Sequence, residues 1–213
     1  VTATVGSFRD AWSVAGALQH KLRTPLNGIL GSLEALSEEE PDRTAQEMAE
    51  WLALVREAAR RLRGHILDLA EFGARLASSD PGEGSAGDDV REAAIRAAAL
   101  AGVEGGVDTE GLAAFPGTLP ISSARLESVL FELFRNSVRA HPRTCPSIAL
   151  RLSRTEDGIA LEVLDDGVHL PPEVLARLWT PLYQFEARST GEAPGTGLGL
   201  TYVALVVSES GGV

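Results

Sequence analysis

A histidine and a proline lie five residues apart in residues 17–36, a segment that otherwise has the pattern of one long amphipathic helix. His20 lies two positions before the apolar residue Leu22 and therefore points about 200° away from it, toward solvent. Thr24 follows one helical turn later on the same face. Pro25 removes one backbone hydrogen bond and bends the helix beside the imidazole. The pattern favours a reactive, exposed histidine, and an ordinary surface histidine beside a kink is the alternative.

Three polar side chains share one stripe of a second predicted helix, residues 126–140. Glu132 and Asn136 are one turn apart, and Arg139 follows three positions later, on the face opposite the leucines. An amide oxygen is a hard ligand suited to Mg²⁺, and a guanidinium can bind phosphate through two hydrogen bonds. A solvated helix face is the alternative, although it would not favour asparagine within a helix. The stripe therefore suits a magnesium-bound triphosphate.

Glycines mark two further candidate binding segments. Gly195, Gly197 and Gly199 precede an apolar helix, where backbone N–H groups and a helix N-terminus can hold phosphate. Asp165 follows a predicted strand and precedes Gly167, which would let the backbone approach a ligand closely. Both segments also fit ordinary turns, so neither identifies a ligand alone.

Two series of apolar residues, at spacings of three and four apart from one gap of seven, predict the helices that present His20. The first is Phe8, Trp12, Ala15, Leu22, Leu26, Ile29, Leu33 and Leu36, and the second is Trp51, Val55, Ala58, Leu62, Ile66, Leu69 and Phe72. A short turn, "SEEEPDR", separates them, which predicts an antiparallel helical hairpin over residues 1–79. Two helices bury little surface, so we expect a second copy to complete a four-helix bundle.

The rest of the chain mixes helices and strands. The stretch "SSDPGEGSAGDD" lacks periodicity, and we expect a flexible linker over residues 80–89. Helices are expected at 90–100, 126–140 and 171–178, a strand pair at 147–153 and 159–165, and short strands within 105–121. This order predicts a multidomain α+β fold, with the hairpin followed by an α/β sandwich over residues 90–213.

Composition limits the partners and the setting. The chain has 213 residues, 44% of them hydrophobic, with no apolar run long enough to cross a bilayer. Its formal charge of −11 disfavours nucleic acid and anionic membranes as partners. The single Cys145 excludes an intrachain disulfide, so a reducing cytoplasm is the simplest setting. The chain begins with Val1, so we expect a fragment whose membrane contact, if any, lies in segments outside it.

Five motifs, in order, resemble those of bacterial sensor histidine kinases. "HKLRTPLNGILG" resembles the phospho-acceptor box, and "ELFRNSVRA" the Asn box. "DDGVH", "LWTPLYQ" and "GTGLGL" resemble the first Gly box, the Phe box and the second Gly box. The resemblance covers nearly the whole chain and implies a dimerisation and histidine phosphotransfer hairpin followed by a GHKL-type (Bergerat) ATP-binding domain.

The resemblance also implies roles for individual residues. His20 would take the γ-phosphoryl group of ATP and pass it to an aspartate of a response regulator, and Thr24 would orient water for dephosphorylating that regulator. Asn136 would bind Mg²⁺, and Glu132 would assist the metal or polarise the nucleophile. Asp165 would bind the adenine amino group. The other implied nucleotide-binding residues are Arg139, Gly167, Gly195, Gly197, Leu198 and Gly199.

Three departures leave a second interpretation open. Lys21 stands where the family has an acid thought to act as a base, and His169 replaces the last glycine of the first Gly box. The chain also stops at "SESGGV", before the one or two strands with which the family normally continues. The main prediction is an ATP-dependent autokinase, with regulator phosphatase activity also implied. The alternative is a phosphotransfer or scaffold protein that keeps the fold without autophosphorylating.

Overall fold

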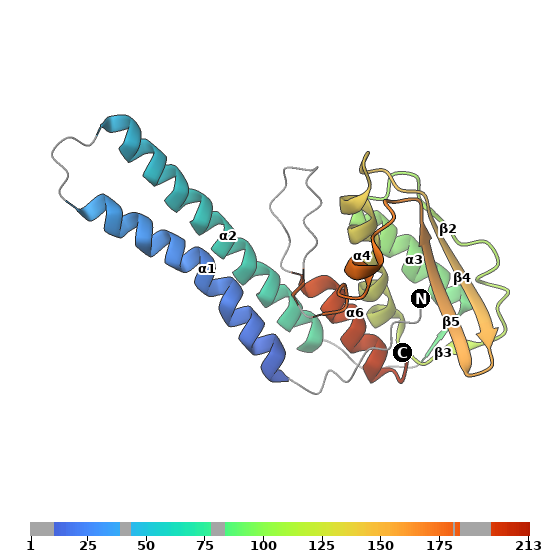
Figure 1. The fold of residues 1–213 in the computed structure, drawn as a ribbon. Coiled ribbons are helices and arrows are strands. Elements are labelled where there is room, and N and C mark those ends of the chain that lie inside the picture. The colour runs from blue at the N-terminus through green and yellow to red at the C-terminus, as the bar shows by residue number, and fades with distance from the viewer. Residues whose placement is uncertain (1–10, 39–43, 78–83, 181, 184–196) are drawn as a thin grey trace.

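The computed structural model describes residues 11–38, 44–77, 84–180, 182–183 and 197–213. The first part is a hairpin of two long antiparallel helices, α1 (Ala11–Ser37) and α2 (Ala45–Ala77), which extends away from the rest of the chain (Figure 1). Helix α1 runs past Pro25 without interruption. Helix α2 begins with a capping box, in which the Thr44 and Glu47 side chains each accept a hydrogen bond from the other residue's backbone N–H.

The hairpin leaves much of its apolar surface uncovered. Leu26, Leu30 and Leu33 of α1 are 44%, 49% and 43% exposed, and Leu52 and Ile66 of α2 are 45% and 52% exposed. No described side chain of α2 is fully buried. Two helices therefore cover only part of the apolar pattern that the sequence carries.

The second part has helices on one side and strands on the other (Figure 1). In the main sheet, β2 (Val107–Asp108) pairs in parallel with β4 (Ile148–Thr155), which pairs in antiparallel with β5 (Gly158–Asp165). A smaller antiparallel pair joins β1 (Ser85–Ala86) to β3 (Thr118–Leu119). The helices are α3 (Gly87–Ala101), α4 (Ser123–Ala140), the short α5 (Pro172–Leu175) and α6 (Leu198–Glu209).

One apolar core holds these layers together. Helix α3 contributes alanines, whose small side chains allow α4 to approach closely, and α4 contributes larger groups such as the fully buried Leu130 and Phe134. Ile148 and Leu150 enter from β4, and Tyr202 and Val206 enter from α6. This arrangement confirms the expected α+β fold and the expected strand pair.

The linker expected over residues 80–89 is wrong in its described second half, because Ser85–Ala86 form β1 and α3 starts at Gly87. The Ser85 hydroxyl is buried and donates to the Ile121 carbonyl group at 2.8 Å. The Asp89 carboxylate accepts a hydrogen bond from the Ala86 N–H at 2.9 Å. The polar and glycine residues that resemble a linker thus form a strand and a helix start.

Gly87→Ala is expected to destabilise the second part by about 3 kcal/mol. A Cβ atom at Gly87 would lie 1.9 Å from the backbone oxygen of Leu112, so one of two packed backbone segments would have to move. Urea denaturation would measure the loss. The matched control is Gly73→Ala, where a Cβ meets nothing within 4 Å on an exposed helix and should stabilise slightly. Equal midpoints for the two variants would contradict this packing.

Among the described residues, no helix combines the length and the apolar character that crossing a lipid bilayer requires.

Candidate functional site

His20 lies on α1 with its side chain exposed, as the sequence predicts. The Thr24 hydroxyl, one turn later and also exposed, donates to the His20 carbonyl oxygen at 3.1 Å. Lys21 is half-buried, and this burial lowers the pKa of its amine below the ordinary value. Solvent and a docking partner can therefore reach the imidazole, and the neighbouring residue is a cation rather than an acid.

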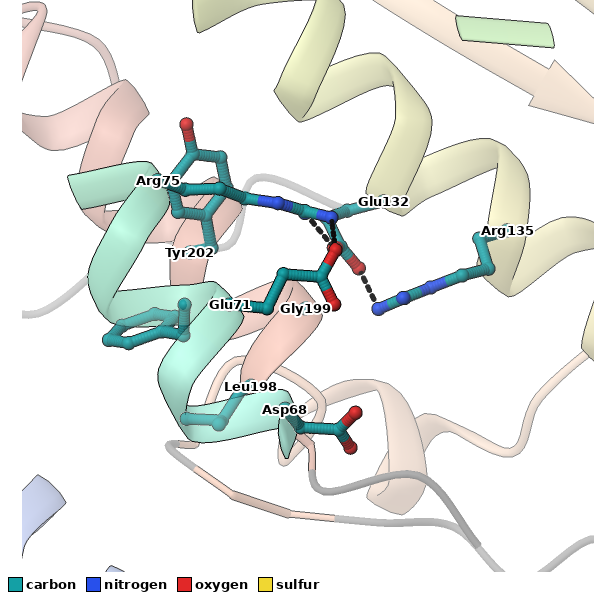
Figure 2. Close-up of a pocket in the computed structure, with 9 residues that line it drawn as sticks. Asp68, Glu71, Arg75, Glu132, Arg135, Leu198, Gly199 and Tyr202 are labelled. Carbon is teal, nitrogen blue, oxygen red and sulfur yellow. Dashed lines mark hydrogen bonds and ion pairs between the residues drawn. The ribbon is translucent and has the colours of Figure 1, made fainter. Parts of the chain in front are cut away.

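The predicted stripe on α4 divides into a buried and an accessible part. Arg139 is exposed and Asn136 is half-buried, but Glu132 is only 3% exposed. The solvated face that the sequence offered as an alternative is therefore wrong at Glu132, because α2 and α6 come close to α4 at this point (Figure 2).

The buried Glu132 forms an ion triad with two partly buried arginines. One carboxylate oxygen accepts a hydrogen bond from Arg75 at the end of α2, and the other accepts one from Arg135 on the next turn of α4 (Figure 2). Both guanidinium groups also lie over the Phe131 ring, at 5.0 and 5.1 Å from its centroid. Arg75 additionally pairs with Glu71 of its own helix.

The charges around Arg75 act on its pKa in opposite directions. Burial alone would lower the pKa of the guanidinium, but Glu132 and then Glu71 raise it, and the net pKa lies above its ordinary value. Arg75 therefore stays charged at every physiological pH. It is the site residue that the sequence did not reveal, because its partner lies 57 positions away.

The described glycines of the second Gly box serve packing in this structure. Gly197 has a left-handed φ of 76°, which ends the preceding segment and starts α6 at Leu198. Gly199 therefore lies within the first turn of α6 and not before it. A Cβ atom there would lie 2.4 Å from the Glu132 carboxylate, so a larger residue would require that side chain to shift. Gly195 lies outside the described residues.

Asp165 ends β5 with its carboxylate exposed and held from two sides. It accepts hydrogen bonds from the Gly167 N–H at 2.8 Å and from the Ser137 hydroxyl at 3.0 Å. A Cβ atom at Gly167 would lie 2.6 Å from this carboxylate, so glycine permits the turn. The carboxylate keeps unused acceptor capacity toward solvent. The His169 side chain is also exposed.

A buried histidine ties the end of α4 to the segment after β5. His141 Nδ1 accepts hydrogen bonds from the Arg143 and Cys145 N–H groups, both at 3.3 Å. Its Nε2 atom lies 3.6 Å from the Asp166 carboxylate, which accepts a hydrogen bond from the Ser147 N–H at 2.8 Å. His141 thus supports the segment that carries Asp165, although no motif close to it in sequence reveals this role.

Asp166→Asn is expected to lower stability at pH 7 and to lose this effect in acid. The hydrogen bond from the Ser147 N–H lowers the pKa of Asp166 below 3.8. A lowered folded-state pKa stabilises the protein fully above the unfolded value, and the stabilisation disappears as the pH falls through the folded-state pKa. Urea midpoints of the two proteins should therefore differ at pH 7 and converge below pH 3.8. A constant difference across this range would contradict the assignment.

The resemblance implies that Glu132 and Asn136 bind Mg²⁺, and the two side chains fit this ion differently. Both Glu132 carboxylate oxygens are bound to arginines, so Glu132 does not fit as a metal ligand in this arrangement. Asn136 does fit, since its half-buried amide can supply one hard oxygen while nucleotide phosphates and water supply the rest. Within the described ranges, no cluster of three His, Cys, Asp or Glu side chains forms a metal site.

Comparisons with known proteins agree with this geometry. The His Kinase A (phospho-acceptor) domain matches residues 13–75, and the histidine kinase-, DNA gyrase B- and HSP90-like ATPase family matches residues 121–213. The chain is 28% identical to the histidine protein kinase DivJ of Caulobacter vibrioides, over 92% of this chain and 33% of that protein. It is 31% identical to the phosphate regulon sensor protein PhoR of Pseudomonas aeruginosa, over 89% of this chain and 43% of that protein.

A third relative is the sensory histidine kinase/phosphatase NtrB of Rhodobacter capsulatus, which is 27% identical over 96% of this chain and 58% of that protein. The chain thus spans between a third and three fifths of the length of these relatives. The phospho-acceptor match covers the hairpin that carries the exposed His20, and the ATPase match covers α4, β4, β5, α5 and α6. The chain is therefore a histidine kinase core, with a phospho-acceptor domain followed by an ATP-binding domain of the histidine kinase, gyrase and HSP90-like type.

Proposed function

We propose that this chain is the catalytic core of a two-component sensor and phosphorylates itself on His20. An imidazole nitrogen of His20 attacks the γ-phosphorus of ATP, the bond to the β,γ-bridging oxygen breaks, and ADP leaves. The phosphoryl group then passes from His20 to an aspartate of a response regulator. The observation that supports this most directly is the exposed His20, one turn before the exposed Thr24, in a chain that also carries an ATPase domain.

Different described residues would bind the adenine, the metal and the phosphates of ATP. Asp165 would accept a hydrogen bond from the adenine amino group, because its carboxylate is fixed by Ser137 and Gly167 yet open to solvent. Asn136 would hold Mg²⁺, which neutralises developing charge on the phosphates. Arg139 is exposed and can reach phosphate, and the N-terminus of α6 at Leu198 would favour the same anion.

The proposed active unit is a homodimer in the cytoplasm. The exposed leucines of α1 and α2 would pair with those of a second copy and complete a four-helix bundle. The response regulator would dock beside His20 and would also be dephosphorylated there, with Thr24 orienting water. The single Cys145 fits a reducing compartment.

A second candidate function remains, supported by two observations. Lys21 cannot act as the base that the resemblance implies, and Glu132 is occupied by Arg75 and Arg135. A protein that accepts phosphate on His20 from a regulator, or only binds the regulator, would need neither acid.

Incubation with γ-labelled ATP and Mg²⁺ separates the two functions. Label that is stable in base, labile in acid and absent from His20→Gln supports the autokinase. The absence of label, together with no nucleotide binding by calorimetry, supports the alternative. His65→Gln, on α2, is the matched control and should keep full labelling.

A further inference from the structure

We propose that Arg75 and Glu132 form a latch that holds the ATP-binding domain against the end of the hairpin. This latch must open before His20 is phosphorylated, a step that rests on the autokinase function proposed above. The two residues belong to different domains, since Arg75 lies in the last turn of α2 and Glu132 lies in the middle of α4. We call this ion pair the latch.

The latch is largely shielded from solvent and lines a pocket between α2, α4 and α6 (Figure 2). The side chains of Arg75 and Glu132 are only 19% and 4% exposed. Beside them, the rings of Phe72 and Tyr202 meet edge to face, with centroids 6.3 Å apart. Figure 2 shows Arg75 reaching from α2 across to α4, with Gly199 of α6 beside the carboxylate. The end of α2 is thus docked on two helices of the ATP-binding domain.

In this state, Glu132 cannot take part in phosphoryl transfer. Each of its oxygens already accepts a hydrogen bond from an arginine, so neither oxygen is free to orient a nucleophile. An acid that should serve the reaction is therefore blocked by a residue of the other domain.

The latch also fixes the ATP-binding domain at a distance from His20. A Cβ atom at Gly28 would lie 3.7 Å from the Cβ of Ala58, which sets the antiparallel register of α1 and α2. Counting from this pair, His20 lies level with Ile66, nine residues before Arg75. At 1.5 Å per residue, the latch is about 14 Å along the hairpin from the acceptor histidine. Movement of the domain along or away from α2 would bring the nucleotide to His20.

Opening the latch would leave neither charge alone. Arg75 keeps Glu71, four residues earlier on α2, and Glu132 keeps Arg135 on α4. Opening breaks the ion pair between the domains and the contact of Arg75 with the Phe131 ring of α4. The latch can therefore have a closed and an open state of similar energy, because Arg75 and Glu132 each have a second ion-pair partner within their own domain.

Two variants of the full chain test the latch by activity. Arg75→Gln removes the charge that crosses the interface, and we expect its initial rate of autophosphorylation to rise about fivefold or more over the unmodified chain. The matched control is Arg61→Gln, an exposed arginine of α2 that pairs only within the helix, with Glu57, and it should keep the unmodified rate. A rate for Arg75→Gln at or below that of Arg61→Gln would overturn the latch.

Hydrogen exchange gives a second readout that does not depend on activity. Arg75→Gln should lose protection in peptides covering the last two turns of α2 and the start of α6, while peptides of α3 stay protected. If neither the original chain nor any variant incorporates phosphate, the proposed autokinase function fails. Hydrogen exchange still tests the latch in that case, because unchanged protection in Arg75→Gln would overturn it. If α3 also loses protection in Arg75→Gln, the second variant is Arg75→Met, which keeps a long apolar stem beside Phe131 but removes the charge. Selective loss of protection at α2 and α6 in Arg75→Met supports the latch, and unchanged exchange in Arg75→Met overturns it.

Discussion

Lys21→Glu is expected to raise the rate of autophosphorylation at least tenfold. Positive charge develops on the imidazole ring as its nitrogen attacks the γ-phosphorus, and the ammonium of Lys21 opposes that charge. A carboxylate at this position can accept the proton from the second ring nitrogen, and a general base contributes about 10²- to 10⁴-fold to a rate. The measurement is the initial rate of label incorporation from γ-labelled ATP.

Lys21→Gln separates the two effects of this substitution. It removes the repulsion without adding a base, so its rate should lie between those of the original chain and Lys21→Glu. The burial that lowers the pKa of Lys21 shows that its neighbourhood already disfavours the ammonium, so the chain should tolerate the neutral side chain. Equal rates for Lys21→Glu and Lys21→Gln would show that no base acts here.

Local patterns were sufficient to predict most of the fold. The apolar spacing of α1 and α2 and the alternation in β4 and β5 each follow from residues close in sequence, and these elements lie where expected. The linker prediction was wrong at Ser85 because glycine, serine and aspartate suit both flexible chains and helix starts. Only the distant Ile121 and the strand β3 make Ser85 an ordered residue.

The sequence predicted only those features of the candidate site that depend on residues within a single motif. The exposure of His20 follows from its position two residues from Leu22, and the turn at Asp165 follows from Gly167. The burial of Glu132 does not, because it depends on Arg75 from another domain. Glu132 lies on a polar stripe of α4, but it is buried because α2 of the hairpin comes close to that stripe. The spacing of residues along α4 contains no information about α2.

The ion triad also affects which roles Glu132 and Asn136 can be given on α4. Breaking a buried pair by removing one partner costs about 3–5 kcal/mol when the other charge stays buried without a partner. Glu132 has two arginines, so losing either one leaves the carboxylate compensated. The acid can therefore change partner without a large penalty, whereas Asn136, one turn later on α4, carries no charge and needs no such partner.

Asn136→Ala is expected to reduce autophosphorylation about a thousandfold, because phosphoryl transfer depends almost entirely on positioning and on neutralising charge. Asn136 is half-buried on α4, one turn after Glu132, and its amide oxygen is the described group on this stripe that fits Mg²⁺. The cause should be visible in binding. A fluorescent ATP analogue should bind the original chain more tightly when Mg²⁺ is added, and Asn136→Ala should show no such gain.

Two further variants decide whether the loss belongs to the metal. Asn136→Asp keeps an oxygen ligand, so Mg²⁺ should still tighten nucleotide binding to it. Ser128→Ala lies two turns earlier on α4, where its hydroxyl bonds only the backbone of its own helix at 3.1 Å, and it should behave as the original chain. If Asn136→Ala binds nucleotide with the full gain from Mg²⁺, the metal is held elsewhere, and the occupied carboxylate of Glu132, freed by opening of the latch, becomes the ligand to test next.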